Sequence, residues 1–182
     1  IIPHRADRDE LLDAAISSAK KSAENANAQY EIIVESQGSK SEARNIAAER
    51  STGDILIFFD DDVVVRDNCI KELIYMFEHP QIGIVGGVNV AMPNISFEEQ
   101  ISASLWASPF TMMKSCARYT PRGGIRETDE SELISCVMAV SRQAFFEAKG
   151  FPLDIIPCEE NVLIQRIQDL GYKVLYNPFA IV

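Results

Sequence analysis

The sequence lacks the features that mark membrane-spanning, metal-cluster and nucleic-acid-binding proteins. No apolar run reaches the roughly 18 residues of a membrane span, and no signal peptide is recognisable. The four cysteines are scattered without a Cys-x-x-Cys pair, so a zinc site is not expected and a reduced cytosolic protein is the simpler interpretation. Acidic residues outnumber basic ones by 27 to 17, which argues against nucleic acid as the main partner.

The 182 residues present suffice for one domain with a substantial buried core. Hydrophobic residues make up 47% of the chain and charged residues 24%, as in ordinary globular proteins. The net charge of -10 still permits a nucleotide ligand, because a divalent cation can hold a diphosphate against an acidic protein. Residues 1–3 and 179–182 both read as interrupted strands, so we expect a piece of a longer protein whose other parts could carry a membrane anchor.

Apolar runs alternate with helical segments through the first half of the chain. The pattern predicts strands at 31–35, 54–59 and 83–90, following a first strand at the N-terminus, and helices at 9–26, 39–50 and 67–78. Ser39 and Glu42 have the spacing of a capping box, which supports the second helix. This alternating order predicts a parallel sheet with right-handed crossovers.

The second half is less regular but remains of the α/β class. Its pattern predicts a helical stretch at 94–115, a loop at 119–129, a strand at 133–140, helices at 142–148 and 159–170, and a strand at 173–176. The single tryptophan, Trp106, lies in the first of these segments. Core packing is the favoured interpretation of Trp106, and stacking on a sugar is the alternative.

Three consecutive aspartates, Asp60, Asp61 and Asp62, follow a strongly apolar strand. Ligands of open α/β sheets bind beyond the carboxyl ends of strands. Because alternate residues of an extended segment point to the same side, we expect Asp60 and Asp62 to converge on one hard cation and Asp61 to point elsewhere. The alternative is a solvated acidic turn that ends the strand.

Three stretches together resemble glycosyltransferase family 2 of the GT-A fold, in the order in which that family carries them. IIPHRADR resembles its first strand and loop, EARNIAAERSTGDILIFFDDDV its Arg-Asn helix and Asp-x-Asp strand, and CEENVLIQRIQDLGYKVLYNP its acidic-pair helix and following segment. The likeness covers nearly the whole chain. The loop from Arg118 to Asp129 and the residue Asn161 resemble exopolysaccharide enzymes of the succinoglycan type.

The resemblance implies a Rossmann-like, three-layer α/β/α sandwich with a mainly parallel central sheet, forming one catalytic domain over 1–182. Residues 1–92 would bind the nucleotide sugar, and residues 93–182 would bind the acceptor and supply the base. The implied reaction is an inverting transfer of a sugar from a nucleoside diphosphate to a hydroxyl of a carbohydrate or lipid-linked acceptor, with Mn²⁺ or Mg²⁺. The implied place is the cytoplasm or the cytoplasmic face of a membrane, with membrane contact through segments outside this chain.

The resemblance also implies roles for residues of the first half. Asp60 would contact the ribose or help to hold the metal, Asp62 would ligate the metal, and Asp61 would belong to the same nucleotide site. Pro3 would line the nucleotide pocket, and Arg44 would lie near the nucleotide or pyrophosphate. The alternative for Arg44 is an ion pair on the helix surface, with a glutamate of its own helix, Glu42 or Glu49.

One position departs from the family. The family usually carries an aspartate at the end of the second strand that binds the base, and Ser36 stands there in this chain. Glu35 precedes it, but a shift of one residue turns a side chain to the other face of a strand. The identity of the nucleotide therefore stays open, with Ser36 as the aligned residue of the nucleotide site.

The pair Glu159-Glu160 opens the predicted helix after Gly150-Phe151-Pro152. Acidic residues are favoured in a first helical turn by the helix dipole, which is the purely structural interpretation. The family's pair is Glu-Asp with the second residue as the base, which maps onto Glu160. Glutamate carries one more methylene than aspartate, so the acceptor must sit differently or the enzyme must be altered or inactive.

Two other functions remain open at the level of sequence. A non-catalytic domain that binds nucleotide sugars would also carry the aspartates, and the Glu-Glu pair and Ser36 are compatible with it. A Mg²⁺-dependent phosphotransferase also places Asp-x-Asp after an apolar strand. Such enzymes have a Thr or Ser two residues after the second aspartate, where this chain has Val64.

Overall fold

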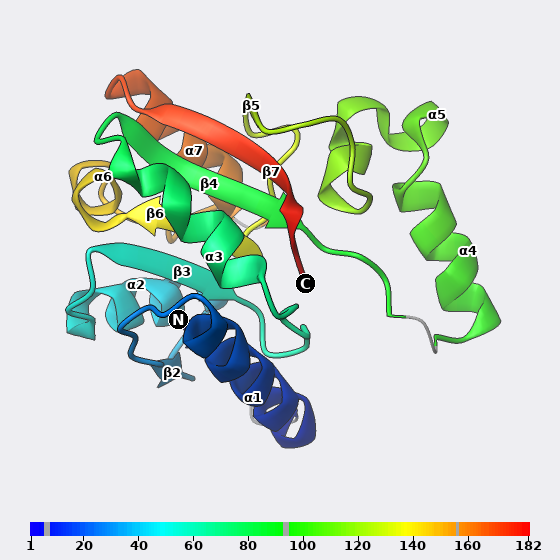
Figure 1. Cartoon of the computed structure of the whole chain (residues 1–182), viewed down its shortest axis with the longest axis horizontal. Coiled ribbons are helices and arrows are strands. Elements are labelled where there is room, and N and C mark those ends of the chain that lie inside the picture. The colour runs from blue at the N-terminus through cyan, green and yellow to red at the C-terminus, as the bar shows by residue number, and fades with distance from the viewer. Residues whose placement is uncertain (6–7, 93–94, 156) are drawn as a thin grey trace.

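The chain forms a three-layer α/β/α sandwich in a computed structural model that describes residues 1–5, 8–92, 95–155 and 157–182 (Figure 1). The strands are β1 (Ile2–Pro3), β2 (Val34–Glu35), β3 (Ile55–Phe59), β4 (Ile82–Val88), β5 (Arg126–Glu127), β6 (Val137–Ser141) and β7 (Lys173–Ile181). The α-helices are α1 (Asp9–Asn25), α2 (Lys40–Arg50), α3 (Cys69–Ile74), α4 (Phe97–Trp106), α5 (Pro109–Met112), α6 (Arg142–Glu147) and α7 (Glu159–Asp169). Two 3-10 helices, η1 (Tyr75–Glu78) and η2 (Met113–Arg118), extend α3 and α5.

The central sheet is mainly parallel, as expected. Its five-stranded part has the order β3-β6-β4-β7-β5, and β1 pairs with β2 beside it in parallel. β6 is antiparallel to both β3 and β4, and β4 is parallel to β7, so β3, β4 and β7 run in one direction. The backbone of Ile1 joins the two parts, because its amine donates to the Ile57 carbonyl at 2.8 Å and its carbonyl accepts from the Phe59 amide at 3.1 Å.

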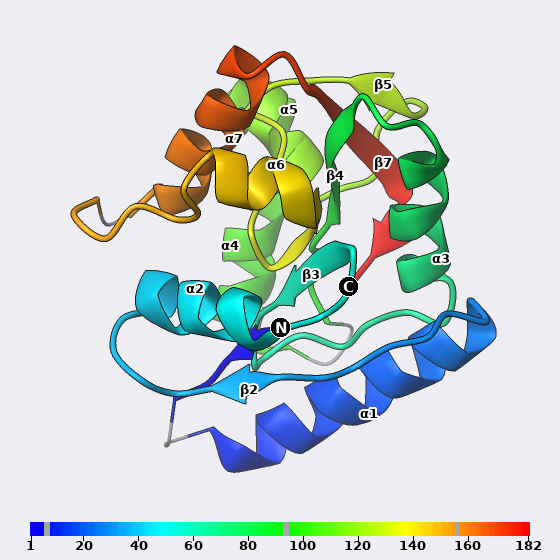
Figure 2. The same ribbon diagram turned by 90° about the vertical axis from the view of Figure 1, so that its left-hand side faces the viewer.

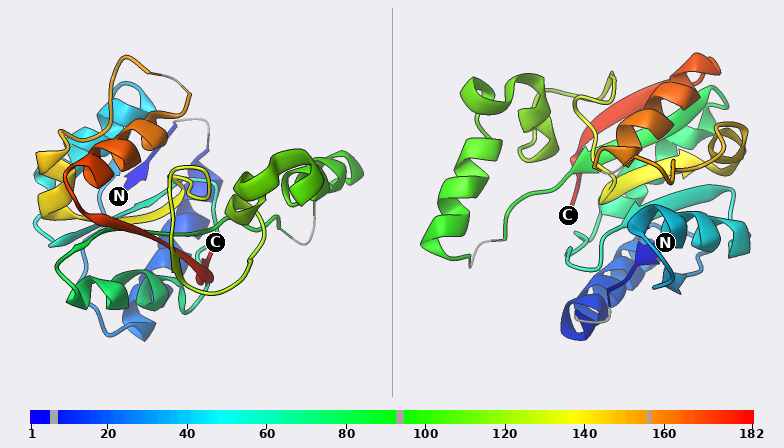
Figure 3. Two further views of the ribbon diagram at one scale, coloured as in Figure 1. Left: turned by 90° about the horizontal axis from the view of Figure 1, so that it is seen from above. Right: turned by 180° about the vertical axis from the view of Figure 1, so that it is seen from behind.

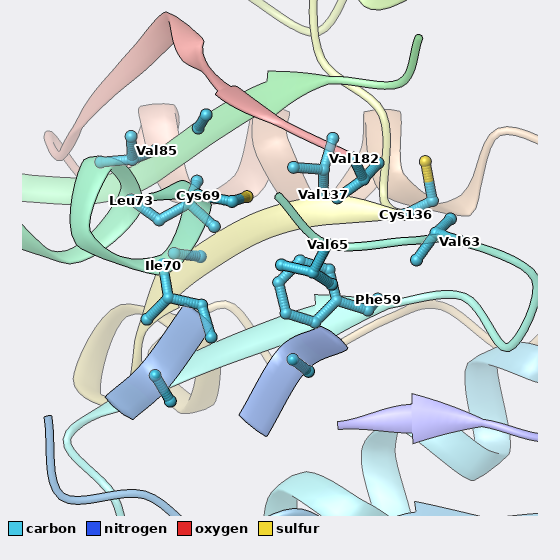
Figure 4. Close-up of a cluster of buried hydrophobic side chains, with 14 of the residues drawn as sticks. Phe59, Val63, Val65, Cys69, Ile70, Leu73, Val85, Cys136, Val137 and Val182 are labelled. Atoms are coloured by element: carbon cyan, nitrogen blue, oxygen red, sulfur yellow. The ribbon is translucent and has the colours of Figure 1, made fainter. Parts of the chain in front are cut away.

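Two apolar clusters fill the spaces between the sheet and its helices. One joins α1 and α3 to one face of the sheet, and Figure 4 shows its members from α3, β3, β4 and β6. The other joins α2, α6 and α7 to the opposite face. Alternate residues of β3 explain the division, because Leu56 and Phe58 belong to the second cluster and Phe59 to the first. Figure 2 shows α2 and α1 on the two sides of the short strand β2.

Most predicted elements are present, but several differ. The helical stretch predicted at 94–115 is divided into α4, α5 and η2, the strand predicted at 31–35 is limited to β2, and the loop predicted at 119–129 contains β5. The helix predicted over 67–78 is α-helical over Cys69–Ile74 and then tightens to a 3-10 turn. The short strand predicted at 173–176 and the strand start predicted at 179 are one strand, β7. Proline lacks an amide donor, and Pro178 lies where the pairing of β7 with β4 shifts register, so the strand continues through it.

Helices α4 and α5 stand apart from the sandwich, on the side where β4 and β7 end (Figure 3). The following 3-10 helix η2 returns to it, since its Ala117 belongs to the second apolar cluster. Helix α4 begins with a capping box formed by Ser96 and Glu99 and has no buried residue. Among the described residues, no helix is both long and apolar enough to cross a lipid bilayer.

Candidate active site

The candidate site lies where β1, β2 and β3 end, and the loops after these strands build it. Asp60 follows β3 directly, while Asp61 and Asp62 lie in a turn. The extended backbone assumed for the triplet is therefore absent. Asp61 and Asp62 share Arg8 as a partner, whereas Asp60 pairs with other cations. The turn is held by the charges around it rather than by strand pairing.

Asp61 is the structural member of the triplet. Its side chain is 1% exposed and accepts hydrogen bonds from the Arg5 amide at 2.9 Å, from His4 Nδ1 at 3.2 Å and from Arg8 Nη1 at 3.3 Å. Burial opposes the charge on this carboxyl, but these donors outweigh it and lower the pKa of Asp61. Asp61 thus fixes the loop after β1 against the end of β3.

Asp60 and Asp62 are the accessible members of the triplet. Asp62 is 40% exposed and pairs with Arg8, whose pKa is raised by the charge of Asp62. Asp60 pairs with Lys40 Nζ at 3.0 Å and with Arg44 Nη2 at 2.8 Å. Both carboxylates help to raise the pKa of the buried Cys136 thiol, after burial itself, so both lie near this one side chain.

Arg44 links the aspartates to the acidic pair on α7. Its side chain is 1% exposed, and its second terminal nitrogen donates to Glu159 Oε1 at 3.0 Å. Phe151 packs under the guanidinium, with 5.2 Å between Cζ and the ring centroid. The surface ion pair with Glu42 or Glu49 is therefore the wrong alternative, because Arg44 points into the protein. Among described residues, Arg44 Nε is a buried nitrogen without a hydrogen-bond partner.

Glu160 lies beside this network without an ion pair of its own in the described structure. It is 9% exposed in the first turn of α7. Its pKa is raised, chiefly by burial and further by the charge of Glu159, while Arg118 and Arg44 act in the opposite direction. A carboxyl with a raised pKa holds its proton more firmly once it has accepted one, which suits a general base.

A small hollow of about 30 Å³ connects the ends of β1 and β2 with α2. Pro3 and Ser36 both line it, together with His4 and Lys40, which contact the aspartates. Glu35 turns elsewhere, because its carboxylate accepts from the amides of Ser36 and Gln37 and pairs with Arg50.

A larger pocket lies elsewhere in the sandwich. It holds about 550 Å³ and is lined mainly by apolar residues of α1, of β3 and of the segment before β2. None of the candidate site residues lines it. The chemistry-bearing side chains therefore gather in an open site and not in this cavity.

The structure places most of the candidate site residues around Asp60 and Arg44. Asp60, Arg44 and Glu159 form one network, Glu160 lies beside it, and Pro3 and Ser36 border it through Lys40. Asp60 and Asp62 have no common partner among the residues that the structure describes, so their convergence on a cation stays a prediction. Sequence reasoning missed Arg8 and Lys40, whose only sequence signal is a basic residue in the loop or helix before a carboxylate cluster.

The donor set of the site fits a hard divalent cation. Within the described ranges, no three His, Cys, Asp or Glu side chains gather as a metal cage. Two accessible carboxylates suit Mg²⁺ or Mn²⁺ held jointly with substrate phosphates. Arg8 would then have to release Asp62, and its side chain, 30% exposed, can swing away.

Comparisons with known proteins identify the family of this chain. The model of the family "Glycosyl transferase family 2" matches residues 8–148. The O-antigen chain rhamnosyltransferase RfbN of Salmonella typhimurium is 28% identical over 141 residues, which are 76% of this chain and 44% of that protein. The chain thus spans less than half the length of this curated relative.

Solved glycosyltransferase structures share the fold. The mannosyltransferase PcManGT from Pyrobaculum calidifontis, in complex with GDP-Man and Mn²⁺, superposes with a TM-score of 0.63 at 14% identity, over 99% of this chain and 54% of that one. Drosophila β1,4-galactosyltransferase 7, in complex with xylobiose, superposes with a TM-score of 0.63 at 17% identity, over 97% of this chain and 62% of that one. A structure of a mutant of that enzyme contains manganese, UDP-Gal and xylobiose. The fold, the site and the family match lead to one conclusion: the chain belongs to glycosyl transferase family 2.

Proposed function

We propose that this glycosyltransferase domain performs an inverting transfer from a nucleoside diphosphate sugar to an acceptor hydroxyl. The observation that carries the proposal is that Arg44 forms two ion pairs, with Asp60 at 2.8 Å and with Glu159 at 3.0 Å. Through Arg44, carboxylates suited to a metal and its diphosphate lie next to a buried carboxylate suited to a base. Residues 1–92 would hold the donor, and residues 93–182 would hold the acceptor.

The first half of the site would bind and orient the donor. The hollow beside Pro3 and Ser36 would receive part of the nucleoside, and Asp60 and Asp62 would hold Mn²⁺ or Mg²⁺ at the diphosphate. Such a cation stabilises the charge of the departing nucleoside diphosphate as a Lewis acid. Relatives of the same fold contain Mn²⁺ with GDP-Man or UDP-Gal, which supports this class of donor.

Glu160 would move the proton. Its carboxylate takes the proton of the acceptor hydroxyl as the oxygen attacks the anomeric carbon, and the bond from that carbon to the diphosphate oxygen breaks. A single displacement inverts the configuration and needs no protein nucleophile. Arg44 neutralises Glu159, so Glu160 is the member of the pair without an ion pair in the described structure.

Release of nucleoside diphosphate tests the proposal. UDP-, GDP- and dTDP-sugars are incubated with the protein and Mn²⁺, both with methyl glycosides as acceptors and with water as the sole acceptor, and the freed diphosphate is measured by a coupled assay. We expect release with one donor class, loss of release with EDTA, and a decrease of about 100-fold in Asp62→Asn, because the cation contributes several kcal/mol. Asp67→Asn is the matched control, since its pair with Lys21 is 64% exposed on both sides.

Two results would contradict the proposal. If turnover with EDTA equals turnover with Mn²⁺, the reaction does not use a divalent cation. Metal-dependent binding of a donor without any release of diphosphate would identify a non-catalytic binding domain.

A further inference from the structure

The single tryptophan of the chain is not part of the core. Trp106 ends α4 and is 50% exposed, which overturns the favoured interpretation from sequence. Its ring packs on Tyr119, with 5.3 Å between centroids and 34° between ring planes. We call Trp106 and Tyr119 the aromatic platform.

The platform is tied to the start of α7. Arg118, next to Tyr119, donates to the Ser131 carbonyl at 3.1 Å and to Asn161 Oδ1 at 3.3 Å. Asn161 directly follows Glu160. The Arg118 carbonyl also accepts from the Asn89 amide at 2.8 Å, which holds η2 at the end of β4.

Electrostatics agree with this placement. Burial is the largest cause of the raised pKa of Tyr119, and the charge of Glu160 adds to it. The charge of the proposed base thus reaches the platform. Because Arg118, next to Tyr119, contacts Asn161 in the first turn of α7, a molecule resting on the platform would have its edge toward the start of that helix.

The shape and chemistry of the platform match a sugar ring. A pyranose has a face of C–H groups and an edge of hydroxyls. The C–H face packs on aromatic faces, whose quadrupole is negative there, and leaves the hydroxyls free at the edge. Ligand sites commonly combine such aromatic surface with a few placed polar groups.

We propose that the aromatic platform is the acceptor subsite and that the acceptor presents a pyranose ring, one of whose hydroxyls faces Glu160. The inference rests on the proposed function and names its second substrate. An acceptor without a sugar ring, such as a serine hydroxyl or a bare lipid phosphate, would leave both aromatic rings uncovered.

Fluorescence tests the subsite without turnover, because Trp106 is the only tryptophan. Methyl glycosides of glucose, galactose, mannose and rhamnose are titrated into the protein with Mn²⁺ and the nucleoside diphosphate that it binds. We expect a saturable change in tryptophan emission with at least one sugar, and loss of that change in Tyr119→Ala. Phe110→Ala is the control, since Phe110 is 97% exposed on the neighbouring helix and should respond like the wild type.

Kinetics separate acceptor binding from a structural role. Trp106→Ala should raise KM for the acceptor about tenfold while KM for the donor changes far less, and Trp106→Phe should recover most of the loss. Phe110→Ala should leave both constants unchanged.

Three outcomes overturn the inference. They are a flat emission response to all four sugars, an emission change that follows protein concentration as in self-association, and an equal effect of Trp106→Ala on both KM values. Donor hydrolysis without acceptor is measured in parallel. If nucleoside diphosphate is released there, the proposed function stands even where the subsite fails.

Discussion

Glu160→Gln is expected to lower the transfer rate by about 10²- to 10⁴-fold, the range that a positioned general base contributes. Glutamine keeps the shape of the side chain but cannot take the acceptor's proton. Donor binding should persist, because Asp60, Asp62 and the hollow beside Pro3 are untouched. Rates are measured by nucleoside diphosphate release with acceptor present, and donor affinity by calorimetry.

Glu159→Gln is the matched control for this substitution. Glu159 sits one position earlier on the same helix, but its carboxylate is held by Arg44 at 3.0 Å. Glu159→Gln should therefore lower the transfer rate much less than Glu160→Gln. If Glu159→Gln is the slower enzyme, the assignment of the base within the pair is wrong.

The pH dependence of the wild-type transfer rate gives an independent test of Glu160 as the base. Burial and Glu159 raise the pKa of Glu160, so the base becomes available only above the ordinary carboxyl range. The rate should therefore rise with pH through that raised pKa and then level off. The same shift makes the ionised residue a cost to folding: the free energy of unfolding should fall as the pH rises through the raised pKa, and Glu160→Gln should lack this decrease.

Arg44→Met is expected to lower the free energy of unfolding by about 3 kcal/mol, because it removes the buried centre of two ion pairs. Asp60 would keep its ion pair with Lys40. Glu159 is only 13% exposed and would lose its ion pair with Arg44, so its charge would be left uncompensated. The loss is measured by urea denaturation monitored by far-UV circular dichroism.

Two further variants make this prediction specific. Arg50→Met removes a pair in which the arginine is 62% exposed, while the buried Glu35 keeps hydrogen bonds from the amides of Ser36 and Gln37, so we expect a loss of about 1 kcal/mol. Adding Glu159→Gln to Arg44→Met should recover part of the stability, since it removes the uncompensated charge. A loss in Arg44→Met no larger than in Arg50→Met would show that the arginine does not hold the site together.

Local signals predicted the fold well. The capping box of Ser39 and Glu42 is present as expected, and it places the start of α2. The apolar run before Asp60 became β3, with its residues divided between the two faces of the sheet. The direction of β6 against its neighbours was not predictable, because strand pairing depends on chain segments far apart in sequence.

The sequence singles out individual candidate residues, but it does not reveal the network of ion pairs that some of them form. Arg44 and Glu159 lie 115 positions apart, and nothing near either residue signals their contact. The extended geometry expected of the aspartates failed because Asp61 is drawn into a turn by His4, Arg5 and Arg8. The expectation that Trp106 packs in the core is wrong, because α4 stands apart from the sandwich and leaves this side chain half-exposed.

The most direct measurement is a crystal structure with Mn²⁺ and the nucleoside diphosphate of the accepted donor, with the metal located by anomalous scattering. We expect the Mn²⁺ peak within bonding distance of an Asp62 oxygen and a diphosphate oxygen, with Arg8 turned away and the nucleoside at Pro3 and Ser36. A metal bound elsewhere, with Asp62 still paired to Arg8 and the diphosphate remote from Glu160, would contradict the account.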